Sequence, residues 1–339
     1  MSLQIPESAA TSEGTYFDRP ADYAEALENA LKLLNELETS TEWEELPERE
    51  EVQLSKIVNA EDPSGVPITR GSTIVEGVSP LELTGVIQLP GMRKKWDPRL
   101  EDGFPIRRFS QSSFEIYSVM KSPSYFIWAR DIVAVQESYW TEPNGKMQLI
   151  QVSVQDEERL PEDGSYQKSR TRATVELSGW IAEKVEEGTK LSYVVKVLLN
   201  GSIPSAVVSS LAQETPMCVG RVRDIYYEHG HAPVELTTRN TTLVKSDFKT
   251  TAITQVFEDE NGEKTWTGHY ASNGPDDLSI LFDSKRMYIG GVNVSVQSND
   301  GNDVSGVHAT VDEENSVVKV KVESLEKGKT FEVVITAKE

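Results

Sequence analysis

Residues 171–198 read TRATVELSGWIAEKVEEGTKLSYVVKVL, and residues 201–227 read GSIPSAVVSSLAQETPMCVGRVRDIYY. The first stretch alternates apolar and polar residues on both sides of a turn at residues 186–188, which predicts two antiparallel strands. The second stretch begins a helix at Pro204 and repeats apolar residues at steps of three and four. Pro216 interrupts this helix and should kink it. Strands followed by one long covering helix form the core of the predicted fold.

The residues before this core predict two more helices and further strands. The first helix starts at Pro20 with an apolar face, and the second starts at Ser79-Pro80 and ends near Pro90. Strand patterns cover residues 52–58, 68–75, 106–109, 113–121, 130–140 and 147–154. Because short turns join consecutive strands, we expect antiparallel pairing and an α+β fold.

The pattern of the chain changes near residue 235. Seven short β runs are spaced as in an immunoglobulin-like sandwich, and they cover residues 251–257, 264–270, 278–282, 287–296, 304–310, 316–323 and 330–337. We therefore expect a flexible tail over residues 1–19 and a first domain over residues 20–235. An all-β accessory domain would then cover residues 236–339.

Charge and cysteine content exclude several classes of protein. The 339 residues carry 34 Lys+Arg and 55 Asp+Glu, a formal net charge of −21, which argues against nucleic-acid binding. Cys218 is the only cysteine, so we expect a reducing compartment, the cytoplasm, with peripheral membrane contact as an option. Eight glutamates lie between residues 36 and 51. They form either an acidic docking surface or, as we favour, a solvated connector.

Five short motifs of the first domain occur in an order typical of one family. They are Trp96-Asp97, Ala129-Arg130-Asp131-Ile132-Val133, Gly179-Trp180-Ile181, Gly188-Thr-Lys190 and Gly201-Ser-Ile203-Pro204. With the predicted order of elements they make residues 23–230 resemble the START family, the StAR-related lipid-transfer domains. The resemblance implies a helix-grip fold, in which a curved antiparallel sheet grips a long C-terminal helix around one internal lipid cavity.

Strand alternation and the helix stripe suggest which side chains would face such a cavity. The strand candidates are Arg130, Ile132, Ala134, Gln136, Ile150, Val152, Val175, Leu177, Tyr193, Val195 and Val197. The helix candidates are Val208, Leu211, Thr215 and Val222. Alternation alone leaves open whether the space is filled or hollow, and the resemblance favours a hollow.

Two polar residues of the predicted strand over residues 130–140 bear on the ligand. Arg130 either contacts the polar group of a ligand or, as we favour, pairs with a neighbouring carboxylate. In sterol-carrying members of the family a second arginine stands six positions after this one, whereas this chain has Gln136. A neutral amide can still hydrogen-bond a hydroxyl or carbonyl in a dry cavity. The glutamine therefore favours a phospholipid, fatty acid or uncharged sterol over a ligand that needs an interior cation.

Residues 138–145 correspond, in the resemblance, to the loop that guards the cavity mouth. Tyr139 and Trp140 either enter the membrane interface or pack against the closing helix. We expect these two residues to form the gate, together with a hinge at Pro216. The compact basic cluster Arg93-Lys94-Lys95 either steers the protein toward phosphate head groups or, as we favour, is solvated surface.

The sequence thus predicts an intracellular protein that holds one sterol, fatty acid or phospholipid and exchanges it during transient membrane contact. No cofactor, metal or catalytic residue is expected, since nucleotide-binding and nucleophile motifs are missing and the pair His229 and His231 lacks a third ligand. Two alternatives stay open. One is an enzyme for a hydrophobic substrate that uses Arg130 and a carboxylate, and the other is a scaffold with a filled core. The second domain is expected to serve for docking or contact with a protein partner.

Overall fold

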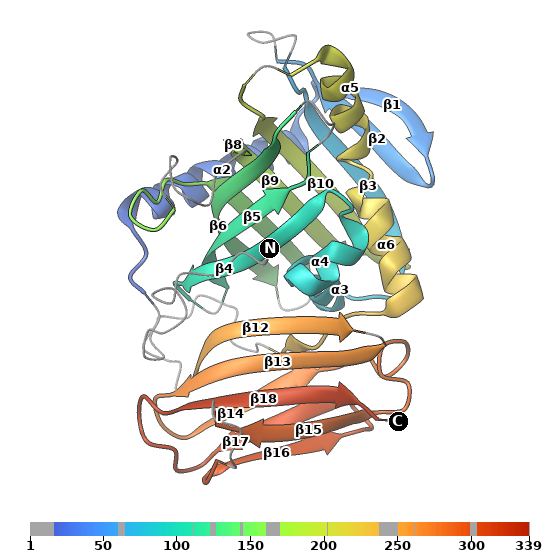
Figure 1. The fold of residues 1–339 in the computed structure, drawn as a ribbon. Coiled ribbons are helices and arrows are strands. Elements are labelled where there is room, and N and C mark those ends of the chain that lie inside the picture. Colours follow the sequence, from blue (N-terminus) through green and yellow to red (C-terminus); the bar gives the residue numbers. More distant parts are fainter. Residues whose placement is uncertain are drawn as a thin grey trace.

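The computed structural model describes residues 17–59, 65–110, 112–122, 127–142, 145–160, 170–201, 203–236, 250–260, 262–298 and 304–338. These residues form a large sheet with helices on both of its faces and, below it in Figure 1, an all-β unit. The predicted tail, residues 1–19, lies outside the described residues up to residue 16. None of the described helices is both long and apolar enough to cross a membrane.

The sheet of the first domain has ten strands in the described part of the chain. Nine follow the order β1-β2-β3-β10-β9-β7-β6-β5-β4 with antiparallel pairing, and β8 pairs parallel to β6. The strands are β1 (Glu44–Arg49), β2 (Val52–Ile57), β3 (Ile68–Glu76), β4 (Leu100–Arg108), β5 (Ser113–Met120), β6 (Ala129–Glu142), β7 (Lys146–Ser153), β8 (Arg170–Arg172), β9 (Thr174–Lys184) and β10 (Gly188–Leu198). The predicted antiparallel sheet is confirmed.

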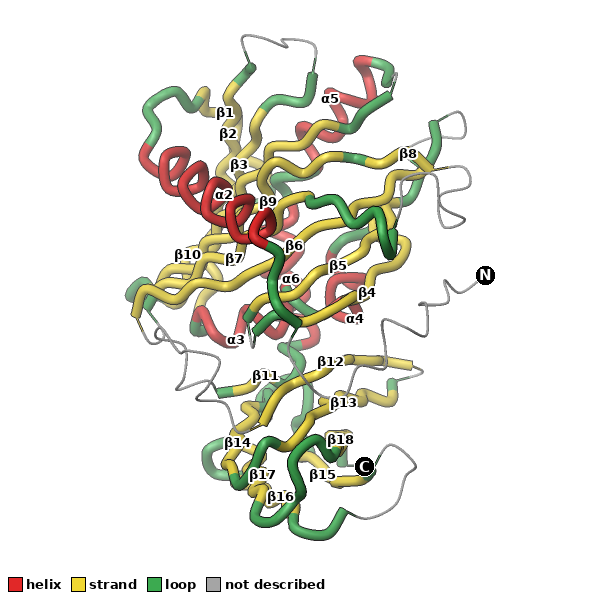
Figure 2. The backbone as a smooth tube through the Cα atoms, turned by 90° about the vertical axis from the view of Figure 1, so that its left-hand side faces the viewer, coloured by secondary structure: helices red, strands yellow, loops and turns green. Residues whose placement is uncertain are grey.

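One long helix covers what we call the outer face of this sheet, as Figure 2 shows. Helix α2 (Ala21–Thr39) buries one side chain on nearly every turn, from Tyr23 through Leu27 and Leu34 to Leu37. These residues pack on Ile150, Val152 and Leu177 of the sheet. A stripe at steps of three and four is what a helix needs in order to lie flat on a sheet.

Four shorter helices cover the inner face. They are α3 (Pro80–Ile87), α4 (Pro90–Trp96), α5 (Ser205–Glu214) and α6 (Cys218–His229). Ser79 caps α3, because its hydroxyl accepts the N–H of Glu82 while the Glu82 carboxylate accepts the N–H of Ser79. The helix predicted from Pro204 onward is divided into α5 and α6 with Pro216 between them, as its missing N–H requires.

The helix-grip α+β arrangement is therefore confirmed, with two elements that the sequence analysis missed. Strand β1 lies in the glutamate-rich segment that we expected to be a connector, and it forms a hairpin with β2. Helix α4 follows α3 directly, because Pro90 suits the first turn of a new helix. Short exposed strands and seven-residue helices carry too little periodicity to be recognised.

The C-terminal unit consists of two four-stranded sheets. One has the order β11-β14-β17-β16 and the other β12-β13-β18-β15. Their bounds are β11 (Val234–Glu235), β12 (Thr250–Glu260), β13 (Glu263–Ser272), β14 (Asp276–Leu281), β15 (Val292–Gln297), β16 (Val307–Asp312), β17 (Val317–Val322) and β18 (Thr330–Ala337). Each predicted β run overlaps one of β12 to β18. Strand β11 begins just before the expected boundary, so the last residues of the first domain already belong to the sandwich.

Candidate functional site

A hollow of about 320 Å³ lies between the inner face of the sheet and helix α5. Its floor comes from strands β6, β9 and β10, and its cover comes from α5 and the loop before it. Most of its wall is apolar, with Ile132 and Val195 on the floor facing Val207 and Leu211 on the cover. A mostly apolar hollow of this size can hold a small amphiphile.

Eight of the fifteen predicted cavity residues line this hollow. They are Arg130, Ile132, Val175, Tyr193, Val195, Val197, Leu211 and Thr215. Among the remaining seven, Gln136 lines a smaller hollow next to it. Ala134 and Val222 are buried in packed surroundings, and Val208 is half-buried on α5. None of these three lines the hollow.

Three residues predicted to face the cavity lie on the opposite side of the sheet. Ile150, Val152 and Leu177 pack under α2, so this part of the prediction is wrong. On β7 the alternation was assigned to the wrong face, and Gln151 is the residue that reaches the hollow. On β9 the pairing with β10 skips Glu176, and this one-residue bulge turns Leu177 away from the face of Val175.

The end of the hollow next to α4, which we call the closed end, carries a network of two arginines and one aspartate. Arg93 and Arg99 both line the hollow, and both donate to the buried carboxylate of Asp97 at 3.2–3.3 Å. Burial alone would raise the pKa of Asp97, but the two guanidinium groups outweigh burial and hold that pKa below its ordinary value. Three fixed charges with a net charge of +1 therefore stand at this end.

The sequence analysis missed this network because it treated Arg93 as part of a solvated basic cluster. That expectation is wrong for Arg93, and Lys95 pairs with Asp259 of the sandwich at 2.7 Å. Lys94 is the exposed member of the cluster and pairs with Asp102. The four-residue spacing between Arg93 and Asp97, which places both on one helix face, was the available signal.

A smaller hollow of about 20 Å³ continues from the main one. Arg93, Gln151, Ser178 and Tyr193 line both hollows. Gln136 and Ser118 also line the small one. The Nε2 atom of Gln136 and the Oγ atom of Ser118 are buried and have no hydrogen-bond partner among the described residues. Leaving a buried donor unpaired costs about 1–3 kcal/mol. These two groups are therefore available to a ligand atom.

Arg130 stands at the other end of the hollow, where it ties two loops together. Its guanidinium donates to the carbonyl oxygens of Trp128, Leu199 and Asn200, the last two at 3.3 and 3.1 Å. The expected ion pair with a carboxylate is thus wrong, since every partner of Arg130 in the described part of the chain is a carbonyl. The neighbouring Asp131 instead accepts from Arg172 and Tyr117.

The surface around this end is apolar and exposed. The side chain of Trp128 is 62% exposed and that of Leu198 is 45% exposed. Helix α5, which forms the cover here, buries none of its ten residues. We call this region the mouth: the residues that Arg130 joins, together with α5. Figure 1 places α5 at the end of the domain that faces away from the sandwich.

Comparison with known protein families identifies the family of this chain. The sequence model of the family "START domain" matches residues 23–221. The chain belongs to the START domain family. The match includes the sheet, both parts of the hollow and the divided last helix up to residue 221.

Solved structures of START domain proteins have the same fold. Human StAR-related lipid transfer protein 5 is 20% identical, with a TM-score of 0.51 over 59% of this chain and 94% of that chain. Human STARD10 is 17% identical, with a TM-score of 0.50 over 65% of this chain and 84% of that chain. A search of curated protein sequences gave no match.

Tyr139 and Trp140, predicted to form the gate of the START domain, lie elsewhere. Both belong to β6, and Arg130 and these two residues are at opposite ends of that strand. Tyr139 packs on the core under α2, and Trp140 packs on the inner core. Neither lines the mouth, so the expectation that they guard it is wrong. Among the described residues, Trp128 is an exposed aromatic side chain that lies at the mouth.

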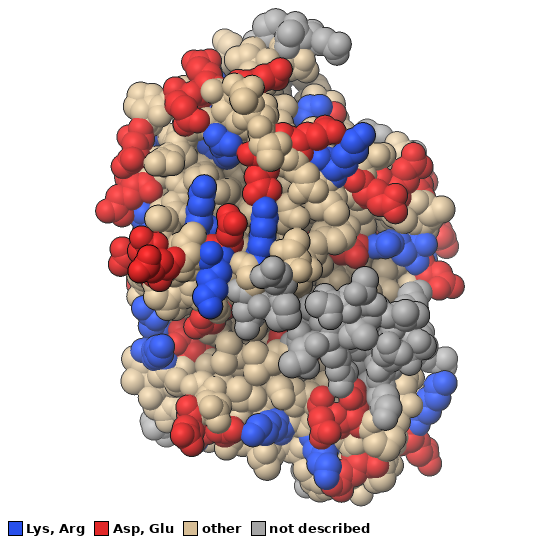
Figure 3. All heavy atoms as spheres, turned by 180° about the vertical axis from the view of Figure 1, so that it is seen from behind, with Lys and Arg blue, Asp and Glu red and all other residues tan. Residues whose placement is uncertain are grey.

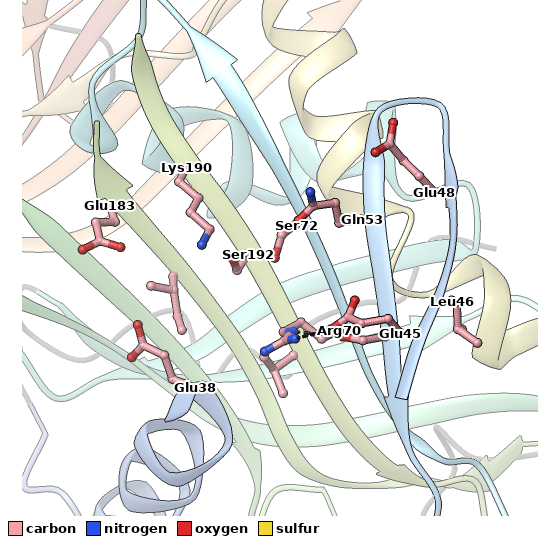
Figure 4. Close-up of a pocket in the computed structure, with 13 residues that line it drawn as sticks. Glu38, Glu45, Leu46, Glu48, Gln53, Arg70, Ser72, Glu183, Lys190 and Ser192 are labelled. Atoms are coloured by element: carbon pink, nitrogen blue, oxygen red, sulfur yellow. Dashed lines mark hydrogen bonds and ion pairs between the residues drawn. The ribbon is translucent and has the colours of Figure 1, made fainter. Parts of the chain in front are cut away.

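A second hollow, about 440 Å³ in volume, lies on the outer face of the START domain. Figure 4 shows Arg70 and Lys190 over its middle strands, with Glu38 and Glu183 on one side. Glu45 and Glu48, from the β1–β2 hairpin, stand on the other side. This lining is polar and charged, which makes the outer hollow unsuited to an acyl chain.

The glutamate-rich segment next to this outer hollow is largely neutralised within the chain. Six of its eight glutamates form ion pairs: Glu36 with Lys32, Glu38 with Lys146, Glu44 with Lys56, Glu45 with Arg70, Glu50 with Arg49 and Glu51 with Arg223. On the face seen in Figure 3, Lys and Arg likewise lie among Asp and Glu. These pairs weaken the interpretation of the segment as an acidic docking surface.

Proposed function

We propose that this START domain holds one lipid in the main hollow, with the polar end of the lipid directed toward Gln136 and Ser118. The observation that carries the proposal is the pair of unpartnered buried polar atoms at the closed end of an apolar hollow. An apolar chain can enter this hollow without displacing any side chain. Its polar end gains two hydrogen-bond partners there. A core filled by side chains would leave no such space.

The dimensions favour a fatty acid or a sterol over a phospholipid with two chains. The main hollow of about 320 Å³ is near the lower end of the range for ligand pockets, roughly 300–1,000 Å³. The small hollow of about 20 Å³ has room for a single group the size of a water molecule, which needs ~10–15 Å³. A hydroxyl or carboxyl group fits there, whereas a phosphocholine head group does not.

The charges at the closed end favour a ligand group that accepts hydrogen bonds. Arg93 and Arg99 outnumber Asp97, and Gln136 offers an N–H donor beside them. A carboxylate would be attracted by the net charge of +1 and by these donors. We therefore place a fatty acid first among the candidate ligands and an uncharged sterol second.

Exchange of the lipid requires an opening at the mouth. Each buried methylene is worth about 0.8 kcal/mol, so an acyl chain leaves into water far too slowly to be useful. Helix α5 is the loosest cover because it buries no residue, and Pro216 is the proposed hinge. Trp128 and Leu198 are the apolar side chains that would enter the membrane interface when the mouth opens.

The ionisable groups of the hollow support binding rather than catalysis. A general acid or base works best with a pKa near the pH of the reaction. The pKa of Asp97 is lowered by its arginines, which outweigh burial, whereas burial raises the pKa of Tyr193 to about 12. Both groups thus keep one protonation state at neutral pH, and we propose no catalytic residue and no cofactor.

The remaining expectations stay part of the proposal. We keep the division near residue 235, with the C-terminal sandwich as an accessory domain that contacts a protein partner. The single cysteine, Cys218, is buried and fits a reducing compartment such as the cytoplasm. Contact with membranes would be transient and peripheral.

Native mass spectrometry of freshly purified protein tests the proposal. We expect an added mass that corresponds to one small amphiphile, which denaturation releases for identification. Delipidated protein should regain that mass after incubation with oleate or cholesterol in vesicles of dioleoylphosphatidylcholine. Protein that never carries an added mass, before or after incubation, would overturn the proposal.

A further inference from the structure

The two halves of the last helix are held very differently. Helix α5 buries none of its residues, whereas α6 buries six, including Cys218, Val222 and Tyr226. Arg223 of α6 also donates to Thr73 and to the carboxylate of Glu51, at 3.3 and 3.0 Å. The segment between the helices contains Pro216, which cannot donate a backbone hydrogen bond. A half that buries no residue thus adjoins a half that buries six, with one proline between them.

The C-terminal sandwich contributes directly to fixing α6. The guanidinium of Arg286 lies 4.5 Å from the ring centre of Tyr226 and donates to its hydroxyl at 3.2 Å. Arg286 belongs to the turn between β14 and β15, so this contact joins the helix to the sandwich. A cation over an aromatic ring, combined with a hydrogen bond, orients both side chains.

Asp283 of the same turn holds the end of α6. Its Oδ2 atom accepts the backbone N–H of His231 at 3.3 Å, and its Oδ1 atom accepts those of Lys285 and Arg286. Gly230, which ends the helix with a φ of +77°, fits against this carboxylate, because a Cβ there would come within 1.8 Å of Oδ2. One carboxylate therefore connects the segment that directly follows the helix with the turn of the sandwich.

The sandwich also packs closely on the two helices beside α6. At Gly91 of α4 a Cβ would lie 1.8 Å from the carbonyl oxygen of Phe257 in the sandwich. At Gly85 of α3 a Cβ would lie 2.4 Å from the carbonyl oxygen of Ala232, in the segment that joins α6 to β11. Lys95 adds an ion pair with Asp259 at 2.7 Å. Buried residues of both domains form one continuous core here. The end of the START domain opposite the mouth is thus closed by the second domain.

We infer that the sandwich acts as a clamp that fixes α3, α4 and α6, so that opening of the lipid hollow is confined to α5 and the mouth. The inference rests on the proposed function in one respect, because the opening is assumed to serve lipid exchange. Its structural content, an α6 that buries six residues beside an α5 that buries none, is independent of any ligand. The clamp gives the accessory domain a role in regulating the hollow.

Hydrogen exchange of the full chain, followed by mass spectrometry, tests the clamp. In buffer, the amides of α5 should exchange at least about tenfold faster than those of α6. Vesicles of dioleoylphosphatidylcholine should speed exchange further in α5 and leave α6 unchanged. Equal exchange of the two helices, in buffer or with vesicles, would overturn the inference.

Arg286→Ala removes the contact with Tyr226, and we expect exchange in α6 to rise about tenfold or more while β12 to β18 stay protected. Lys285→Ala is the matched control, because that side chain is exposed and has no partner in the described structure.

A second variant is available if Arg286→Ala unfolds the sandwich. Tyr226→Phe keeps the ring and removes only the hydroxyl, so we expect a smaller rise of exchange in α6. Unchanged α6 exchange in the variant that folds would overturn the inference. If no lipid binds, the proposed function is wrong, but these exchange rates still test whether the sandwich fixes α6.

Discussion

The carbonyl oxygen of Pro216 lies directly against the backbone of Gly71. A Cβ atom at position 71 would come within 2.1 Å of that oxygen, closer than any real contact allows. Gly71 belongs to β3 on the inner face, and Pro216 lies between α5 and α6. The missing side chain of Gly71 therefore lets the proposed hinge sit on the sheet.

Replacing Gly71 with alanine tests the importance of this close approach. We expect Gly71→Ala to lower the free energy of unfolding by about 1–3 kcal/mol, because the backbone at Pro216 must move. Lipid transfer between vesicles should become faster, since the displaced segment carries α5 with it. Gly290→Ala is the control: its nearest atom would lie at an ordinary 3.4 Å, and its stability should stay within about 0.5 kcal/mol of the original.

Replacing Gln136 with leucine separates stability from ligand binding. Gln136→Leu removes a buried donor that has no partner in the described part of the chain. The free energy of unfolding of delipidated protein, measured by thermal denaturation, should therefore rise by up to about 1 kcal/mol. Affinity for oleate should fall about tenfold, because one hydrogen bond to its polar end is lost. Gln148→Leu is the matched control, because that amide donates to Asn35 on the outer face. The control should lose stability and keep its affinity, and a loss of affinity in both variants would argue against the assigned role of Gln136.

The sequence predicted the elements of this fold more reliably than the faces they present. Both faces of the large sheet are covered by helices, α2 on one side and α3 to α6 on the other. The apolar residues that alternate along β7 can therefore be buried on either face of the sheet. Ile150 packs under α2, although the same pattern is compatible with a position in the hollow. Alternation identifies a buried face only when the other face is exposed.

Two further features were out of reach for physical reasons. The bulge at Glu176 reverses the alternation of β9 after Val175, and pairing with β10, which no local pattern records, creates it. Arg130 holds the carbonyl oxygens of Trp128 and Asn200, and so joins two segments about 70 residues apart. Carbonyls are present at every residue, so such contacts leave no trace in side-chain composition. In contrast, the break at Pro216 followed from proline chemistry alone.

Arg130 should act as a latch at the mouth. Arg130→Met keeps the length of the side chain and removes its donors to Leu199 and Asn200, so the two loops are no longer tied together. We expect the free energy of unfolding to fall by about 1–3 kcal/mol and lipid transfer to become several-fold faster. Arg70→Met is the control, because that guanidinium holds Ser55 and Glu45 on the outer face. Equal transfer rates in the two variants would contradict the latch.

Glu115 should make stability depend on pH near neutrality. Its side chain is fully buried and accepts from Arg107 at 2.6 Å and from Tyr23 at 3.1 Å. Burial raises its pKa to about 7, with Arg107 opposing this rise and Asp156 adding to it. Between the ordinary pKa of 4.5 and this value, the folded state binds more protons than the unfolded state. The free energy of unfolding should therefore fall as the pH rises through this window, by about 3 kcal/mol in all.

Glu115→Gln keeps the shape of this side chain and removes its titration. Urea denaturation at pH 5.5 and pH 8 should show a clear loss of stability for the original protein and a smaller loss for the variant. At pH 8 the variant should be the more stable of the two, because it avoids the cost of a buried charge. Glu176→Gln, which alters a half-exposed carboxylate paired with Lys196, should keep the original dependence on pH. Parallel dependence in Glu115→Gln and the original protein would place the titration on another group, because the buried carboxylate is the only charge that this change removes.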